Sequence, residues 1–267
     1  MTARRPLRPL LLFSGFLLAF PALGQDDRTS SSSAWEIGFE ELYYDVRWSG
    51  MKAGKGMFRA YPSNTGLVLR AQICSSGFVE AFYPVRDQIY TSARFKNDEL
   101  MPQHNRITQI ERGRTKEKTL DFQSGGKVLF RKGDKEKTIE IPEGTLDVLS
   151  AIYTIRRMPL NEQEERRLPL IDGKKRKTLV VPAMDRVEED GKELLRVEPY
   201  TVGPDGKRKG GDDWLLHLTP EGHIPVRMNL DLSFGSLDMR LTKVRREPGD
   251  DPDSPRMFCD EEVRMPR

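Results

Sequence analysis

Large apolar side chains alternate with polar ones along much of this chain, and that period of two constrains its fold more than any other feature. Residues 42–48 read LYYDVRW, so the apolar side chains at positions 42, 44, 46 and 48 share one face of a predicted β-strand. A turn at Gly50–Gly54 follows, and Leu67–Ile73 repeats the alternation. Further predicted strands are Met57–Tyr61, Val85–Thr91, Thr119–Phe122, Lys127–Arg131, Thr138–Ile141, Leu179–Val181, Leu194–Val197 and Trp214–Leu218.

The clearest hairpin is expected near the end of this pattern. Alternating apolar residues run from Val226 to Phe234 and again from Leu237 to Leu241, on either side of Gly235–Ser236. A two-residue Gly-Ser loop suits a type II′ turn, which sets the register of the two strands. All six paired side chains then share one buried face. The predicted pairs are Phe234 with Leu237, Leu232 with Met239, and Leu230 with Leu241.

One segment departs from the strand pattern. Residues 145–158 read TLDVLSAIYTIRRM, in which Leu149 and Tyr153 are spaced for one face of a helix. Thr145 can cap its N-terminus and Pro159 stops it, so we expect a buried helix over about 145–157. The predicted fold class is mainly β (α+β), with a single strongly curved antiparallel sheet or half-open barrel wrapped around one buried helix.

The first 24 residues are predicted to be a signal peptide. Three Arg precede the apolar core LLLFSGFLLAF, which is too short to span a bilayer comfortably, and cleavage is expected between Gly24 and Gln25. An uncleaved membrane anchor is the alternative. A lipoprotein is not indicated, because no Cys stands at the cleavage point. The exported chain is expected to have a flexible linker at 25–38, one β-rich domain at 39–244 and a polar, disordered tail at 245–267.

Removal of this segment changes the charge of the chain. The whole sequence carries 44 Lys+Arg and 41 Asp+Glu, and its first 24 residues hold three Arg and no acid, so the exported chain is neutral. A neutral chain lacks the basic surface that nucleic-acid phosphates require. We therefore expect no nucleic-acid partner, and no transmembrane span in the mature chain because it has no second long apolar stretch.

Cys74 and Cys259 are the two cysteines of the chain. In an oxidising compartment they can form a disulfide, which would stabilise the fold by about 5 kcal/mol through the entropy of the long loop that it closes. The alternative is two free thiols, because Cys259 lies in the polar tail. A metal or redox role is not indicated, because no CxxC motif is present.

No catalytic constellation is recognisable, so we predict no catalytic residue, no cofactor and no metal site. His217 and His223 are interpreted as solvent-facing strand and turn histidines rather than a metal pair. Asp147 and Ser150 are interpreted as a helix cap and a small packing residue rather than parts of a hydrolytic triad. Adjacent acids such as Glu40–Glu41 point to opposite faces of a strand, so they cannot flank a glycosidic bond.

Four segments, taken in order, resemble a bacterial envelope family known as domain of unknown function 3108. They are ELYYDVRWSGMKAGKG at 41–56, VEAFYPVRDQIYTSA at 79–93, TLDVLSAIYTIRRMPL at 145–160 and WLLHLTPEGHIPVRMNLDLSFGSLDMRL at 214–241. The resemblance implies an exported, β-rich protein in the periplasm of a Gram-negative type of envelope. It supplies no reaction, ligand or site residue. The charged stretches at 112–118 and 161–167 depart from the family pattern.

Aromatic and charged side chains that a curved sheet would turn inward are the candidates for a binding surface. Arg86, Asp87 and Arg156 are interpreted either as a buried ion pair that positions the helix or as an anchor for an anionic ligand. The aromatic residues are either core or the lining of an apolar groove. The candidate ligand-facing residues are Tyr44, Trp48, Phe82, Arg86, Tyr153, Arg156 and Trp214.

Three functions follow as hypotheses. The first is a non-catalytic binder of a hydrophobic or amphiphilic envelope component, such as a lipid, or of an envelope protein. The second is a hydrolase acting on envelope glycan or lipid, recognisable by two acids about 5–9.5 Å apart in an open cleft. The third is a structural or assembly factor, recognisable by a solvent-facing apolar patch.

Overall fold

The computed structural model describes residues 38–64, 66–111, 113–159, 164–208, 213–232 and 235–248, together with Phe258. Contacts divide the chain into two units, and the unit Ala34–Arg267 holds every described element. The predicted signal peptide, nearly all of the predicted linker and most of the predicted tail lie outside the described residues. Their assignment stays a prediction.

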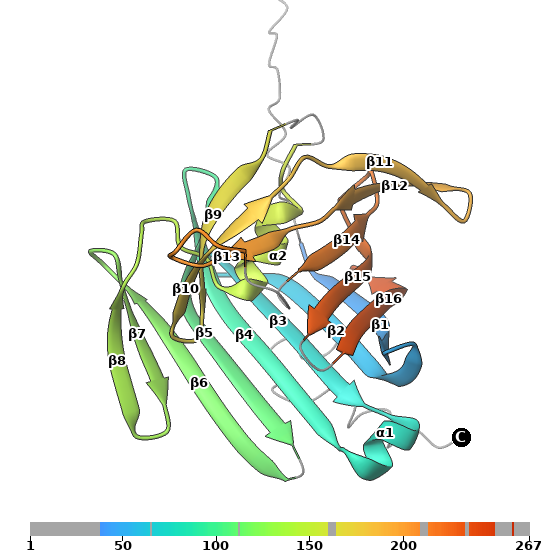
Figure 1. Ribbon diagram of the computed structural model, residues 1–267, viewed down its shortest axis with the longest axis horizontal. Coiled ribbons are helices and arrows are strands. Elements are labelled where there is room, and N and C mark those ends of the chain that lie inside the picture. Colours follow the sequence, from blue (N-terminus) through green and yellow to red (C-terminus); the bar gives the residue numbers. More distant parts are fainter. Residues whose placement is uncertain are drawn as a thin grey trace, which may run out of the picture. The chain divides into compact units, whose positions relative to one another are not determined.

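Thirteen strands form one antiparallel sheet, which curves around a concave side (Figure 1). Its two edges are β11 and β8, which do not pair with each other, so the sheet does not close into a barrel. In spatial order the strands are β11 (Asp185–Glu189), β12 (Lys192–Val197), β14 (Trp214–Leu218), β15 (Pro225–Leu232), β16 (Gly235–Arg245), β1 (Glu40–Trp48), β2 (Met51–Ser63), β3 (Gly66–Ser75), β4 (Val85–Lys96), β5 (Glu99–Glu111), β6 (Arg114–Gln123), β7 (Lys127–Lys132) and β8 (Lys135–Glu140).

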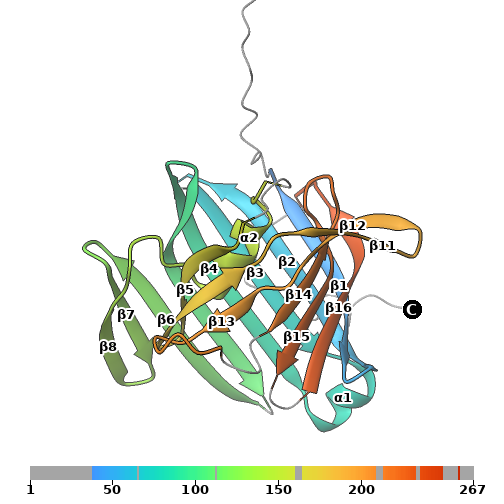
Figure 2. The same ribbon diagram turned by 45° about the horizontal axis from the view of Figure 1, so that its top comes forward.

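A second sheet of three strands lies over the concave side, in the order β13-β10-β9 (Figures 1 and 2). Its strands are β9 (Arg166–Asp172), β10 (Lys175–Val181) and β13 (Tyr200–Val202). A parallel bridge between Leu146 and Leu170 joins β9 to the loop that precedes helix α2 (Val148–Ile155). The described chain is therefore mainly β, with few helices.

Helix α2 is shorter than the predicted span of 145–157. Asp147 caps it by accepting hydrogen bonds from the backbone N–H groups of Leu149 and Ser150, whereas the Thr145 hydroxyl donates to the carbonyl of Pro142. After Ile155 the backbone tightens into a turn in which N–H groups bond three residues back. The helix therefore begins after the Asp147 cap and ends one turn before Pro159.

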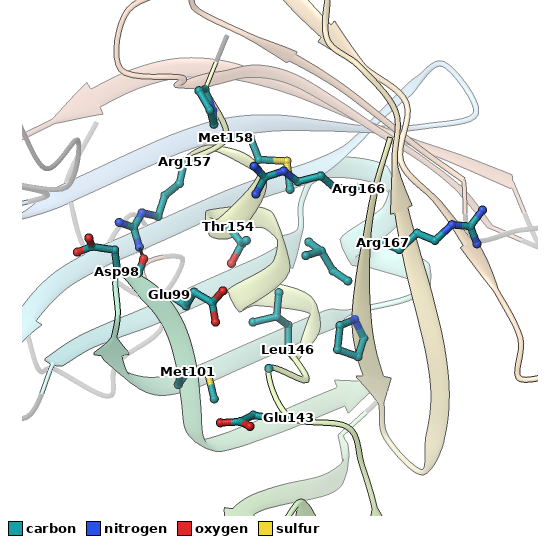
Figure 3. A pocket seen from close by; sticks show the side chains of 14 residues that line it. Asp98, Glu99, Met101, Glu143, Leu146, Thr154, Arg157, Met158, Arg166 and Arg167 are labelled. Carbon is teal, nitrogen blue, oxygen red and sulfur yellow. Dashed lines mark hydrogen bonds between the residues drawn. The ribbon is translucent and has the colours of Figure 1, made fainter. Parts of the chain in front are cut away.

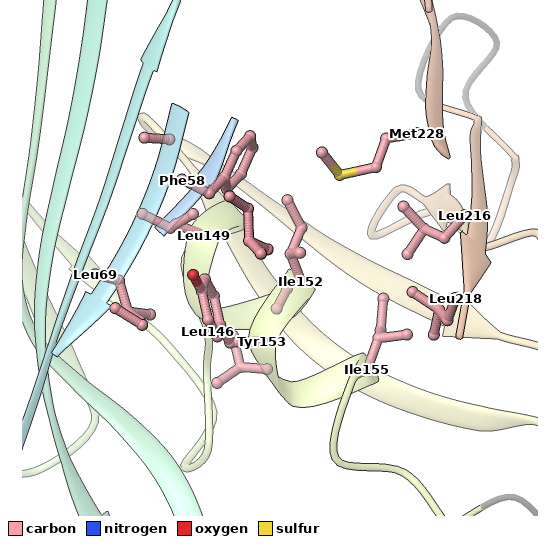
Figure 4. Packing of buried hydrophobic residues seen from close by; sticks show 14 of the residues in the cluster. Phe58, Leu69, Leu146, Leu149, Ile152, Tyr153, Ile155, Leu216, Leu218 and Met228 are labelled. Carbon is pink, nitrogen blue, oxygen red and sulfur yellow. The ribbon is translucent and has the colours of Figure 1, made fainter. Parts of the chain in front are cut away.

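The core joins α2 to both sheets. Figure 4 shows helix residues such as Leu149 and Ile155 between Phe58 and Leu69 on one side and Leu216, Leu218 and Met228 on the other. The same cluster includes Leu170 and Leu179 from the smaller sheet. Each fully buried Leu or Ile contributes roughly 1.5–3 kcal/mol. Packed side chains thus occupy the space between α2 and the large sheet.

Several finer predictions are corrected by this arrangement. A single sheet wrapped around one buried helix is not confirmed, because a second sheet packs on the same core. The described chain also has a second helix, α1 (Gly77–Phe82), which contributes no buried residue. The first turn lies at Ser49–Gly50 rather than Gly50–Gly54, because strand β2 already begins at Met51. With this shorter turn, β1 and β2 pair along the whole of β1, from Glu40 to Trp48.

The predicted hairpin forms, but each residue of β16 pairs four positions away from its expected partner. Leu230 pairs with Leu237 and Leu232 with Gly235, so Gly235–Ser236 belongs to β16 instead of the turn. The physical reason is that the start of β16 also pairs with the end of β1, where Leu237 is opposite Trp48. A shift of four residues, like any even shift, preserves which face each side chain occupies. Leu237 and Leu241 accordingly pack against the core, while Phe234 lies outside the described residues.

Candidate functional site

A cleft of about 410 Å³ opens where the end of α2 meets the start of β9 (Figure 3). One wall comes from the β4–β5 turn and the start of β5, and a second from the loop that precedes α2. Its volume is near the lower end of the range of about 300–1,000 Å³ that small-molecule sites occupy. The lining residues on which its chemistry depends are Glu99, Met101, Glu143, Thr154, Arg157 and Leu168.

The first wall depends on a tight turn. Asn97 and Asp98 have positive φ angles of 51° and 62°, which two-residue type I′ hairpins require and which these two residue types tolerate better than most. Lys96 and Glu99 pair directly across the turn. The Arg157 guanidinium, at the end of α2, donates to the carbonyl of Asp98. This bond fixes the position of the turn relative to the helix.

The second wall is fixed to β9 by backbone hydrogen bonds. The N–H of Leu146 donates to the carbonyl of Pro169 at 2.9 Å, and the N–H of Ile171 donates to the carbonyl of Leu146 at 2.9 Å. Leu146 and Met158 are buried beneath the opening, so the cleft has an apolar floor. Both walls and the floor are therefore built on hydrogen-bonded elements, as a preformed site requires.

Among the described residues that line the cleft, Thr154 has a buried polar group without a hydrogen-bond partner. Its hydroxyl oxygen is buried and has no hydrogen-bond partner among the described residues. A buried hydroxyl without a partner costs about 1–3 kcal/mol, so a bound molecule that supplies a partner would recover that energy.

Charges of both signs surround the opening. Lys96 Nζ lies 2.7 Å from Glu143 Oε1, and this hydrogen bond holds the pKa of Glu143 below its usual value. Partial burial lowers the pKa of Arg157. Arg166 and Arg167 are exposed at the start of β9. A rim of this kind suits a ligand whose polar end carries both charges or several hydrogen-bonding groups.

Glu143 is not suited to act as a general acid. A general acid needs a raised pKa so that it holds a proton at neutral pH, whereas Glu143 is kept ionised by Lys96. The described residues contain no group of three His, Cys, Asp or Glu side chains arranged to hold a metal ion.

The predicted ion pair takes a different form from the one expected. Arg156 forms a bidentate pair with Glu40, at 2.8 Å and 3.1 Å, and both side chains are almost fully buried. Its Nε also donates to the carbonyl of His223 at 2.9 Å, and its guanidinium lies 4.9 Å from the Tyr153 ring centroid. These contacts connect the end of α2 to β1 and to the β14–β15 turn. With its donors directed to protein groups, Arg156 is suited to positioning the helix rather than to holding an anionic ligand.

Arg86 and Asp87 do not pair with each other. Arg86 bonds Glu80 of α1, with its two terminal nitrogens each 2.8 Å from a carboxylate oxygen. Asp87 lies on the other face of β4, where burial raises its pKa and Gln109 donates a hydrogen bond to it. Adjacent residues of a strand point to opposite faces, which explains the separation.

The seven candidate ligand-facing residues are divided between the core and the far end of the sheet, and none of them lines the cleft just described. Tyr44, Tyr153 and Arg156 are buried in or beside the core, and Trp214 is half-buried against it. Burial raises the pKa of Tyr44 well above its usual value, and its hydroxyl donates to the carbonyl of Pro225 at 2.8 Å.

The remaining three candidates lie at the far end of the sheet. Trp48 and Phe82 are exposed there, at the ends of β1 and α1, and Arg86 is paired with Glu80. The cleft residues were missed because they come from four separate segments. The usable sequence signals were the Asn97–Asp98 turn and the stop at Pro159.

The histidines are bonded rather than merely solvent-facing. His217 is buried, with Nδ1 2.5 Å from Glu189 Oε2, and His223 Nδ1 lies 2.5 Å from the carbonyl of Arg156. His104 Nδ1 lies 2.6 Å from Asp121 Oδ1. The prediction of solvent-facing histidines is therefore wrong for His217.

An open, curved antiparallel sheet with a helix and a small second sheet on its concave side defines a barrel-like β-domain. The family model described as a protein of unknown function (DUF3108) matches residues 43–242, and the chain belongs to this family. No curated protein matches the chain.

Among solved structures, the chain is similar to a beta-barrel-like protein of domain of unknown function DUF1849 from Brucella abortus. The match has 13% identity and a TM-score of 0.55, and it covers 80% of this chain and 99% of that chain. At this identity the similarity establishes the fold alone. Along the described residues, no helix has the length and apolar character needed to cross a bilayer.

Proposed function

We propose that this protein is exported to the periplasm and binds, without catalysis, a small amphiphilic envelope component in the cleft at the end of α2. Export is supported by the basic start, short apolar core and small residues of 1–24. The proposed domain layout keeps the linker at 25–38, the domain at 39–244 and the tail at 245–267.

The observation that carries the binding proposal is the cleft itself. An apolar floor formed by Leu146 and Met158 lies beneath a charged rim, and the unpartnered Thr154 hydroxyl lies between them. A ligand with an apolar part and a small polar end matches both regions. The packed interior favours this cleft over a groove between α2 and the large sheet, where side chains already meet.

Protein purified from its own envelope fraction tests the proposal by native mass spectrometry and solvent extraction. A co-purifying small amphiphile is expected, and Leu168→Trp, which fills the cleft, should reduce its occupancy roughly tenfold or more. Leu129→Trp is the matched control, because Leu129 is also half-buried but lies on β7, away from the cleft. An empty wild-type protein, or equal occupancy in both variants, would contradict the proposal.

We further propose that Cys74 and Cys259 form a disulfide that holds the tail against the outer face of the large sheet. Cys74 is buried, and no free cysteine is found among the described residues. Phe258, which precedes Cys259, donates its backbone N–H to Gln72 Oε1 at 3.0 Å, and its ring meets Tyr43 edge-on with centroids 6.2 Å apart. Gln72 and Cys74 point to the same face of β3, so these contacts bring the tail close to Cys74.

A further inference from the structure

Several large apolar side chains are exposed to solvent at the end of the sheet opposite the cleft. We call the group Trp48, Met51, Phe78, Phe82 and Tyr83 the aromatic patch. Phe78, Phe82 and Met51 are 75%, 67% and 59% exposed. Trp48 and Met51 flank the β1–β2 turn and pair with each other. Clustered exposed residues of this size mark an interaction surface more often than single ones do.

Helix α1 is held to the sheet with its aromatic side chains turned away. The N–H of Ser76 donates to the carbonyl of Ala53 at 2.9 Å, which places the helix beside the start of β2 and therefore near Met51. Glu80 bonds Ser75 and Arg86 on the protein side. Phe78 and Phe82, four residues apart, pack against each other on the outer side, with ring centroids 4.5 Å apart and the rings tilted by 44°. The charged residue of α1 is thus bonded inward while its apolar residues face solvent.

The charges around the aromatic patch complement an anionic surface. Three acids at this end of the sheet are bonded by a cation: Asp45 by Lys52, Glu80 by Arg86 and Glu111 by Lys116. A fourth, Asp87, forms no ion pair among the described residues, and burial raises its pKa. Arg47 and Arg114 are exposed and have no ion-pair partner among the described residues. Anionic head groups would therefore meet two exposed cations without an ion-pair partner, whereas the one acid without such a partner, Asp87, is partly buried.

We propose that the aromatic patch inserts into the head-group region of an anionic phospholipid membrane and so holds the protein at the membrane surface. Trp, Tyr and Phe side chains beside basic residues are characteristic of membrane interfaces. The twelve-residue strand β4 runs from α1 to the Asn97–Asp98 turn, which separates the patch from the cleft by roughly 36 Å. This surface is therefore independent of the proposed cleft ligand.

Flotation with vesicles tests the proposal on the chain from Gln25 onward, which contains the whole compact unit from Ala34 and omits the apolar signal core. Binding to phosphatidylcholine vesicles that contain phosphatidylglycerol is expected, with weaker binding when the anionic lipid is left out or salt is raised. Phe78→Ser/Phe82→Ser should weaken binding roughly tenfold or more. Arg47→Glu/Arg114→Glu should weaken it mainly on the anionic vesicles.

Phe95→Ser is the matched control, because Phe95 is an exposed aromatic residue at the opposite end of β4. It should bind as the wild type does. Near-ultraviolet circular dichroism checks that each variant is folded. Absent wild-type binding to anionic vesicles, or unchanged binding by folded Phe78→Ser/Phe82→Ser, would overturn the proposal. So would self-association that the double variant abolishes while vesicle binding persists, because the patch would then be a protein interface.

Discussion

At the scale of single residues, the buried pair of Glu40 and Arg156 joins the end of α2 to the large sheet. Removing one partner leaves an uncompensated charge in the core, which costs about 3–5 kcal/mol. Glu40→Leu should therefore lower the free energy of unfolding by that amount. Adding Arg156→Met should restore part of it, because the second charge is removed as well.

Urea denaturation of the two single variants and the double variant measures this coupling. The control is the exposed pair of Arg186 and Glu193 on β11 and β12, whose side chains are 60% and 56% exposed. Losing that pair should change stability by less than about 1 kcal/mol. Equal effects at the buried and exposed pairs would refute the positioning role of Arg156.

Thr154 allows a second test at this scale. Thr154→Val keeps the shape of the side chain and removes a buried hydroxyl that has no protein partner, so the empty protein should become more stable by about 1 kcal/mol. The ligand should bind more weakly at the same time. Thr91→Val is the matched variant, because the Thr91 hydroxyl donates to Asp147 at 3.0 Å and its loss should destabilise the fold. Destabilisation by both variants would show that Thr154 does have a partner.

At the scale of elements, Asp147 connects the start of α2 to two neighbouring strands. Its Oδ1 accepts from Thr91 of β4 at 3.0 Å and from Asn105 of β5 at 3.4 Å, in addition to the cap bonds. Its Oδ2 accepts from the Ser150 hydroxyl at 2.6 Å. Asp147→Ala removes every one of these contacts and should cost about 3–5 kcal/mol.

The same residue predicts a pH dependence. Complete burial raises the pKa of Asp147 although hydrogen bonds from Ser150 and Thr91 oppose that shift. Between the unfolded and native pKa values the native state then binds more protons, so this contribution to stability decreases as pH rises through the native pKa. The difference in unfolding free energy between wild type and Asp147→Asn should fall with increasing pH above about 4. A difference that is constant or rises with pH would contradict this reading.

The sequence predicted those elements whose apolar spacing within one segment is sufficient to specify them. The bounds of Trp214–Leu218 were predicted correctly, and the helix was found, because apolar spacing alone specifies both. Strand β5 was missed, since Pro102 and His104 interrupt any apolar alternation over Glu99–Glu111. The first two residues of β9 and the first half of β6 lie in stretches interpreted from the sequence as charged departures from the family pattern. Pairing with neighbours, which no single segment reveals, makes these polar segments strands.

At the scale of the whole molecule, the family and the mainly β class could be predicted, but the cleft could not. Its walls come from Asp98–Glu99, Glu143–Leu146, the end of α2 and the start of β9, and the last of these belongs to the second sheet. That sheet was not expected. A site built from distant loops leaves little trace in a sequence, whereas the aromatic patch leaves one in the local string FVEAFY.

The last prediction concerns the proposed tether between Cys74 and Cys259. In the chain-entropy model, a disulfide closing so long a loop contributes about 5 kcal/mol, so a reductant should lower the free energy of unfolding by up to that amount. Cys74→Ser should lower it similarly and make it insensitive to reductant. Phe258→Ala, which removes the ring contact with Tyr43, should cost about 0.5–1.5 kcal/mol in the oxidised protein. Its effect should shrink after reduction, because an untethered tail loses that contact in any case.

Urea denaturation with and without reductant measures each value, and peptide mapping without reduction identifies the bond. Thiol reagents that label Cys74 in the folded, oxidised protein would rule the tether out.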